Sequence, residues 1–182
     1  NRDYLYENET EMIPCYVTKI EYIEDQGLIK DGIDYDNDIV IYLKEGQNYD
    51  LEKIKYVYEW IGDNAYYDQL LTGSSKNQSI YNVFIKGNAV CAGFAKTSQV
   101  IFQNIGIDSM IITGYSTGSH MWNIVKYNGK FYYYDSTYAA SIRDKKHKNY
   151  YDGLKQENMN FYTVDYENWY PRIEKENELY KN

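Results

Sequence analysis

Cysteine and histidine are scarce in this chain, which has two of each among its 182 residues. They are scattered without the short ligand spacing of a zinc site, so we expect neither a metal nor another cofactor. No apolar run approaches 18 residues, which excludes a membrane-spanning helix. The net charge of −8 provides no basic surface for a phosphate backbone, so nucleic acid is excluded as a partner.

What the chain does contain is typical of a globular protein. Hydrophobic residues make up 43% of it, and tyrosine alone occupies 24 positions. We predict a β-rich extension at 1–48, a core domain at 49–170 and a charged tail at 171–182 that forms an exposed helix or a frayed end. Because the chain begins at Asn1 without Met, we expect a fragment or processed form, with an extracellular or cell-surface location.

The extension contains two predicted strands and one loop that imitates a calcium site. Tyr16–Ile23 and Asp38–Leu43 have the composition of strands. Acidic residues between positions 34 and 45 are spaced like those of an EF-hand, but Ile39 stands where that loop needs Gly for its sharp turn. We therefore predict a solvated acidic loop there.

The first helix of the core is predicted from Leu51 to about Asp63, with Asp50 as its N-cap. Apolar side chains at helical spacing form one face, and charged side chains lie on the other. The inner residues are Leu51, Ile54, Tyr58 and Ile61, and the outer ones are Lys53, Lys55 and Glu59.

A second helix is predicted from Cys91 to Ile105, because small and apolar residues recur there every three or four positions and Gly106 ends the pattern. Cys91 therefore lies in or just before the first turn, where free N–H groups and the helix dipole favour a thiolate. Its own N–H could donate to an oxyanion. Two other roles compete: a small buried side chain at a helix start, and a disulfide with Cys15.

A β-hairpin is predicted around Asn128-Gly129, the strongest short hairpin signal, between two runs rich in aromatic and β-branched residues. With that turn, Trp122 lies opposite Asp135, and His120 points to the same side as both. The Cα atoms of His120 and Asp135 are then about 7–8 Å apart. Docking the Cys91 helix against this face would complete a Cys-His-Asp triad.

These residues occur in motifs that resemble those of the transglutaminase-like superfamily. The matching positions are Gly87, Cys91, Phe94 and Ala95 at the helix start, His120, Trp122 and Asn123 on one strand, and Asp135 and Thr137 on the next. The resemblance implies a papain-like α+β fold, in which a catalytic cysteine at a helix N-terminus packs on an antiparallel sheet that carries His and Asp. It extends from about Tyr49 to Trp169, with Asn160–Asp165 as a closing strand.

The predicted reaction is acyl transfer through a thioester. Cys91 attacks a carboxamide or peptide carbonyl, His120 protonates the departing amine, and Asp135 orients the imidazole. Water as the second nucleophile makes the enzyme a cysteine protease or amidase, and an amine makes it a transglutaminase. Tyr67 and Trp122 are the candidates for oxyanion or substrate contacts, although aromatic packing is the competing role for Tyr67.

We favour a cysteine hydrolase acting on a protein or peptide, and we expect the cell wall or cell surface as a source of that substrate. Two alternatives remain open. One is an amidase for cell-wall peptides or glycoprotein linkages, and the other is a catalytically silent binding or structural module of a surface protein. His147, in a basic loop at 143–148, is interpreted as an exposed side chain rather than a second base.

Overall fold

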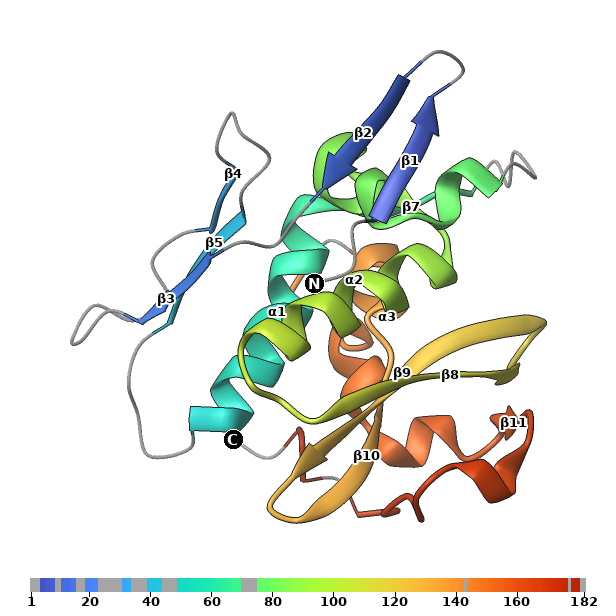
Figure 1. The fold of residues 1–182 in the computed structure, drawn as a ribbon. Helices are drawn as coiled ribbons and strands as arrows, with labels where there is room; N and C mark the ends of the chain where they lie inside the picture. Colours follow the sequence, from blue (N-terminus) through green and yellow to red (C-terminus); the bar gives the residue numbers. More distant parts are fainter. Residues whose placement is uncertain are drawn as a thin grey trace.

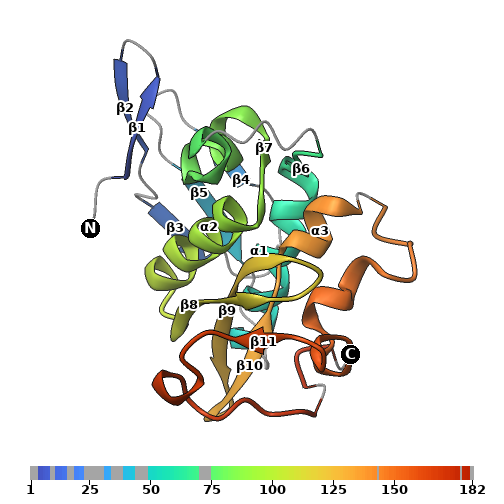
Figure 2. The ribbon, with the colours of Figure 1, turned by 90° about the vertical axis from the view of Figure 1, so that its right-hand side faces the viewer.

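The computed structural model describes residues 4–8, 11–15, 19–22, 31–33, 39–43, 49–69, 75–142, 144–176 and 178–180. The central element is a four-stranded antiparallel sheet in the order β10-β9-β8-β11 (Figure 1). Helices α1 (Tyr49–Asn64) and α2 (Cys91–Asn104) pack on one face of this sheet. The segment that carries β11 packs on the other face (Figure 2). The strands are β8 (Ser109–Tyr115), β9 (Ser119–Tyr127), β10 (Lys130–Tyr134) and β11 (Thr163–Val164).

Alternation along β9 and β10 separates two hydrophobic cores, because successive side chains of a strand point to opposite faces of the sheet. Val125, Tyr132 and Tyr134 join the core that α1 and α2 form. Trp122 and Ile124 join a smaller core on the opposite face, with Ile112, Met159 and Tyr162. The sheet is therefore covered on both sides.

The β9–β10 hairpin follows the predicted register. Tyr127 pairs with Lys130 and Val125 pairs with Tyr132. Asn128 and Gly129 have φ angles of 49° and 77°, the left-handed values that a two-residue hairpin turn of type I′ requires. The prediction of this turn is confirmed.

The prediction for α1 is confirmed for its buried face and wrong for Lys53. Ile54, Tyr58 and Ile61 are fully buried. Lys53, expected outside, is also buried, and its Nζ donates to the carbonyl oxygen of Ile105 at 2.9 Å. That carbonyl lies just past the last residue of α2, where an ammonium group satisfies free carbonyls and the negative end of the dipole.

Short elements connect the helices to the sheet. Strand β6 (Tyr66–Tyr67) runs parallel to β7 (Asn88–Ala89). One residue, the N-cap Val90, separates the end of β7 from the start of α2 at Cys91. The pairing of β6 with β7 brings Tyr67 close to the chain that leads into Cys91. The other short helices are η1 (Ser75–Gln78), the π-helical η2 (Asn82–Lys86), α3 (Thr137–Ser141), η3 (Tyr150–Leu154), η4 (Gln156–Met159) and η5 (Glu167–Trp169).

The predicted closing strand is confirmed only over Thr163–Val164, which pairs with Gly114 and Tyr115 at the edge of β8. A turn at residues 160–161 precedes it. Gly114 is required here, because a Cβ atom would overlap the backbone of Thr163.

The charged tail does not end as predicted. Ile173 forms a bridge with Phe131, the N–H of Glu174 donates to the carbonyl of Phe131 at 2.8 Å, and Leu179 is fully buried in the core shared with α1 and α2. Ile173, Glu174 and Leu179 are thus held against the rest of the protein, whereas residues 175–176 and Tyr180 are exposed. The prediction of an exposed or frayed tail is wrong for the packed positions.

The N-terminal extension consists, where it is described, of short strands that pair with one another. They are β1 (Tyr4–Asn8) with β2 (Glu11–Cys15), and β5 (Ile39–Leu43) between β3 (Lys19–Tyr22) and β4 (Asp31–Ile33). The predicted strands at 16–23 and 38–43 correspond to β3 and β5. The acidic loop begins outside the described residues, and the domain boundary at 48 stays a prediction.

Candidate active site

Cys91 is the first residue of α2. The preceding residue, Val90, is extended (φ −105°, ψ 178°), and its carbonyl accepts the N–H groups of Gly93 and Phe94. The Cys91 thiol is free and partly exposed, so a disulfide with Cys15 is not formed. By helix geometry, the N–H groups of Cys91 and Ala92 have no acceptor within the helix, which leaves positive partial charge beside the sulfur.

His120 and Asp135 meet across the hairpin. His120 is the second residue of β9, and Asp135 follows β10 directly. Nε2 of His120 lies 2.7 Å from Oδ2 of Asp135, whose side chain is 1% exposed. The hairpin register that local sequence predicts therefore brings the imidazole and the carboxylate into contact.

The Cys91 thiol reaches the same imidazole. A hydrogen bond joins the thiol to the His120 side chain, and the backbone N–H of Met121 also donates to the sulfur. Asp135 lies at Nε2 of this ring, so one imidazole contacts both the thiol and the carboxylate. The three side chains form one hydrogen-bonded series.

Helix α2 approaches the hairpin from the face opposite to the one predicted. Nδ2 of Asn123 donates to the carbonyl of Ala95 at 3.0 Å, and Ser98 Oγ lies 3.0 Å from Ser136 Oγ. These contacts attach α2 to the side of β9 that His120 does not share. Cys91, the first residue of α2, therefore lies beside His120, the second residue of β9, at the end of the sheet.

The electrostatics favour charge separation within the series. Burial alone would raise the pKa of the Cys91 thiol, but the hydrogen bond and positive charge of His120 lower it below its usual range. Burial opposes protonation of His120, yet its bonds to Asp135 and Cys91 raise its pKa to about 10. The pKa of Asp135 is lowered, because the His120, Tyr162 and Thr137 hydrogen bonds outweigh the effect of burial. Each of these three shifts favours the charged form of its group.

The side-chain carboxylate of Asp135 has two further partners that the sequence did not reveal. The hydroxyl of Tyr162 donates to Oδ2 at 2.7 Å, and the N–H of Thr137 donates to Oδ1 at 3.0 Å. The backbone N–H of Asp135 donates to the carbonyl of Gly153 at 2.9 Å. Tyr162 lies in the predicted closing strand, and that prediction placed it near the sheet that carries Asp135. No sequence motif, however, predicted the hydrogen bond between Tyr162 and Asp135.

The two aromatic candidates occupy different positions. Trp122 is fully buried and stacks on the His120 ring, with centroids 5.6 Å apart. It therefore has no exposed surface with which to touch a substrate, and it supports the imidazole from behind. Tyr67 is partly exposed, and its pKa is raised by burial and then by the negative charge of Cys91. Tyr67 thus stays protonated beside the thiol.

A cavity of about 510 Å³ opens beside the imidazole. A second cavity of about 500 Å³ adjoins it and shares Tyr67 and Ser141 in its wall. The two cavities form the candidate substrate cleft. The first is lined by Tyr67, residues 116–120, Asp135, Thr137, Tyr138, Ser141, Ile142, Phe161 and Tyr162.

Other predicted features lie away from this cleft. His147 is exposed in its loop, where its Nδ1 accepts the N–H of Asn149 at 3.2 Å. Among the residues that the structure describes, no group of three or more His, Cys, Asp or Glu side chains forms a potential metal site. Within the same ranges, no helix has both the length and the apolar character needed to cross a membrane.

Comparison with known proteins identifies the family. The profile of the transglutaminase-like superfamily matches residues 37–136, which include Cys91, His120 and Asp135. The chain belongs to the transglutaminase-like superfamily. The predicted membership and the α+β fold are thereby confirmed. The match ends before Tyr162, which therefore lies in a part of the chain that the match does not cover.

Relatives of this transglutaminase-like chain are distant. Kyphoscoliosis peptidase of Homo sapiens and of Mus musculus are each 23% identical to it, over 69% of this chain and 21% of their own length. The chain thus spans about a fifth of these curated relatives. A crystal structure of a TGase shares 19% identity and a TM-score of 0.45, covering 53% of this chain and 29% of that one.

Proposed function

We propose that this chain catalyses thiol-dependent acyl transfer on a protein or peptide amide, with Cys91 as nucleophile, His120 as acid and base, and Asp135 as its orienting carboxylate. Membership of the transglutaminase-like superfamily supports thiol-dependent acyl transfer in general. The observation that carries the specific assignment is the continuous hydrogen-bonded series from the thiol through the imidazole to a buried carboxylate.

The reaction proceeds through a thioester. The Cys91 thiolate attacks the amide carbon, a C–S bond forms, and the carbonyl electrons move onto oxygen. On collapse the C–N bond breaks, and the His120 imidazolium transfers its proton to the departing amine. His120, now neutral, removes a proton from the second nucleophile, which attacks the thioester and releases the thiolate. Asp135 holds the ring in one orientation throughout.

The oxyanion is stabilised from two directions. The N–H of Cys91 lies in the first turn of α2, where it has no intrahelical acceptor, so it is available to donate to the oxyanion. Tyr67 supplies a phenolic O–H from the wall of the cleft. Its raised pKa keeps that proton in place beside a developing negative charge.

Hydrolysis is the proposed outcome rather than transamidation. Asp135 lines the 510 Å³ cavity but is already bonded to His120, Tyr162 and Thr137. Asp68 lines the adjoining cavity, where it accepts Nδ2 of Asn77 at 3.1 Å. Both carboxylates of the cleft are thus engaged within the protein, which disfavours binding of a lysine ammonium, whereas water needs no carboxylate. The curated relatives are also named as peptidases.

The substrate is proposed to be a protein or peptide that presents an uncharged group to the cleft. The cavity wall combines hydroxyl side chains with the rings of Tyr67, Tyr138 and Phe161, and the ring of Phe161 is 53% exposed. Such a wall binds apolar and amide groups without requiring a charge. An extracellular or cell-surface location is part of this proposal, and an amidase for cell-wall peptides is the same chemistry on another substrate.

The test is the pH dependence of Cys91 alkylation by iodoacetamide, followed by mass spectrometry of the labelled peptide. Wild type is compared with His120→Ala, and Cys15→Ser serves as the matched control. We expect labelling well below the ordinary thiol pKa of about 8.5, slowed by His120→Ala and unchanged by Cys15→Ser. Labelling that requires alkaline pH in the wild type would support the silent binding module instead.

A substrate screen then separates the two acyl acceptors. Wild type and Cys91→Ala are incubated with a denatured protein substrate, with and without a fluorescent primary amine. Cleavage without incorporation of the amine is expected. Covalent incorporation of the amine, absent from Cys91→Ala, would assign a transglutaminase.

A further inference from the structure

We propose that Tyr162 is a positioning residue of the catalytic series, which holds the Asp135 carboxylate against His120. This inference rests on the proposed thiol chemistry. Tyr162 lies outside residues 37–136, the part of the chain that matches the superfamily profile, so the family match assigns it no role.

Two donors converge on one oxygen. Oδ2 of Asp135 accepts the Tyr162 hydroxyl at 2.7 Å and lies 2.7 Å from Nε2 of His120. Oδ1 is held by the N–H of Thr137 at 3.0 Å. With one donor on Oδ1 and two on Oδ2, rotation of the carboxylate about its Cβ–Cγ bond would break at least two hydrogen bonds. The oxygen that faces the imidazole is therefore fixed in place.

The Tyr162 ring is itself held rigidly. It packs edge-on against Trp122, with centroids 4.8 Å apart, and against His120, with centroids 5.7 Å apart. The residue is 9% exposed. Burial and then the charge of Asp135 raise the pKa of Tyr162, so its hydroxyl remains a donor across the working pH range. Tyr162 thus supplies a fixed donor rather than a second titrating group.

The series continues past Tyr162 to α3. The side chains of Tyr162 and Tyr138 share a hydrogen bond, and Tyr138 lies in the wall of the cleft. Donors from α3 and from the chain before β11 therefore approach Asp135 together. Titratable groups that act on the Asp135–His120 pair from other elements are Cys91 of α2, Tyr58 of α1, Tyr67 of β6 and Tyr134 of β10.

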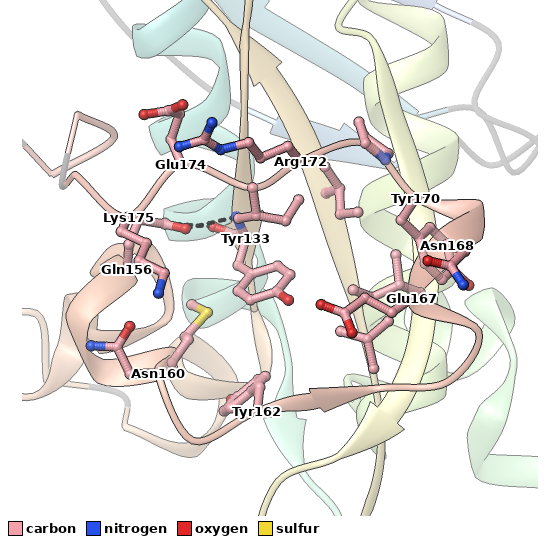
Figure 3. A pocket seen from close by; sticks show the side chains of 16 residues that line it. Tyr133, Gln156, Asn160, Tyr162, Glu167, Asn168, Tyr170, Arg172, Glu174 and Lys175 are labelled. Atoms are coloured by element: carbon pink, nitrogen blue, oxygen red, sulfur yellow. Dashed lines mark hydrogen bonds between the residues drawn. The ribbon is translucent and has the colours of Figure 1, made fainter.

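Tyr133 provides a matched control for the loss of one phenolic hydroxyl. Its ring stacks on that of Tyr162 at a centroid distance of 6.3 Å, and both side chains line a cavity of about 640 Å³ under the sheet (Figure 3). The backbone of Tyr133 is held by Gln156, which accepts its N–H and donates to its carbonyl, each at 2.8 Å. Tyr133→Phe therefore removes a hydroxyl from the same cluster without touching Asp135.

The first readout needs no substrate. The chain has two histidines, His120 and His147, so the imidazole signals can be assigned by NMR with one His147→Gln variant. The pKa of His120 is raised to about 10 in the wild type. In Tyr162→Phe the carboxylate loses one of its three donors, so Oδ2 is held by His120 alone and is less firmly fixed against the ring. We expect the His120 pKa to fall by at least about half a unit toward its ordinary value, and to stay unchanged in Tyr133→Phe.

The second readout is the rate at which the Cys91 thiol reacts, both with a peptide substrate and with an alkylating reagent. Because a hydrogen bond to a charged group is lost, Tyr162→Phe should slow peptide hydrolysis by about tenfold, through a lower kcat rather than a higher KM. Alkylation of Cys91 at neutral pH should slow by a similar factor, about tenfold. The melting temperature of Tyr162→Phe should remain close to that of Tyr133→Phe, because the ring is retained.

Each alternative has its own signature. An unchanged His120 pKa in Tyr162→Phe would reduce Tyr162 to a packing residue. A His120 pKa that rises instead would mean that Tyr162 competes with the imidazole for Oδ2 and does not position it; either result overturns the proposal. A wild-type Cys91 that alkylates only at alkaline pH would defeat the proposed function on its own, and the NMR titration would still decide the role of Tyr162.

Discussion

Nδ2 of Asn123 donates to the carbonyl oxygen of Ala95 at 3.0 Å, and this bond attaches the strand that carries His120 to the helix that begins at Cys91. The same nitrogen lies 3.5 Å from Oε1 of Gln99. Asn123 is 1% exposed, so water does not replace these contacts. Asn123 therefore has a structural role, which is to set the distance between Cys91 and His120.

Replacement of Asn123 by Ala is expected to destabilise the protein and to slow Cys91 alkylation. The Ala95 carbonyl loses its side-chain partner in a buried setting, which costs about 1–3 kcal/mol. Urea unfolding measures the stability loss. Asn104→Ala is the control, because Asn104 is exposed and bonds only within its own helix, to the carbonyl of Val100 at 2.8 Å. Equal losses in both variants would contradict the role of Asn123.

Gly153→Ala should disrupt the site without altering any titratable group. A Cβ atom at Gly153 would overlap the carbonyl oxygen of Asp135 and lie 2.9 Å from the Tyr58 hydroxyl. Relief of that overlap must shift the backbone that holds Asp135, at a cost of about 1–3 kcal/mol. We expect a lower melting temperature and slower alkylation. Gly118→Ala is the stability control, since a Cβ there meets nothing within 4 Å.

The stability difference between wild type and Asp135→Asn should depend on pH. The His120 pKa is raised from 6.5 to about 10 on folding, so its contribution is complete below pH 6.5 and is lost as the pH rises toward 10. The Asp135 pKa is lowered from 3.8, so its contribution is present above that pH and is lost as the pH falls through the folded-state value. The stability difference between wild type and Asp135→Asn, called the gap below, should be largest between about pH 4 and 6.5.

Urea midpoints at pH 5, 7 and 9 check this profile. A gap that is constant across the three pH values would mean that the Asp135–His120 contact does not couple protonation to folding. A gap that grows with pH would contradict the direction of the His120 shift.

Leu179→Ala is expected to destabilise the core by about 2–5 kcal/mol, the usual loss for a buried leucine. Leu179 is fully buried among residues of the core that α1 and α2 form. The control is Glu176→Ala, an exposed position of the same tail that should change stability by less than about 0.5 kcal/mol. Thermal unfolding measures the stability of both variants. If Leu179→Ala left the melting temperature unchanged, the tail would not be part of the core.

Local sequence determined the features whose causes are local. Asn128-Gly129 supplies the left-handed turn, and the turn sets which residues of β9 and β10 are paired. The recurrence of small and apolar residues after Cys91 sets the start of α2. From these two patterns alone, the contact between His120 and Asp135 and the place of Cys91 at a helix N-terminus could be predicted.

The tertiary structure decided which side chains are buried together and from which direction α2 approaches. Tyr162 bonds to a carboxylate 27 residues earlier, and Lys53 donates to a carbonyl 52 residues later. Leu179 enters the core from a tail whose composition is charged. Periodicity reports which residues share a face of their own element, but the partner of that face is chosen by packing between elements that are distant in the chain.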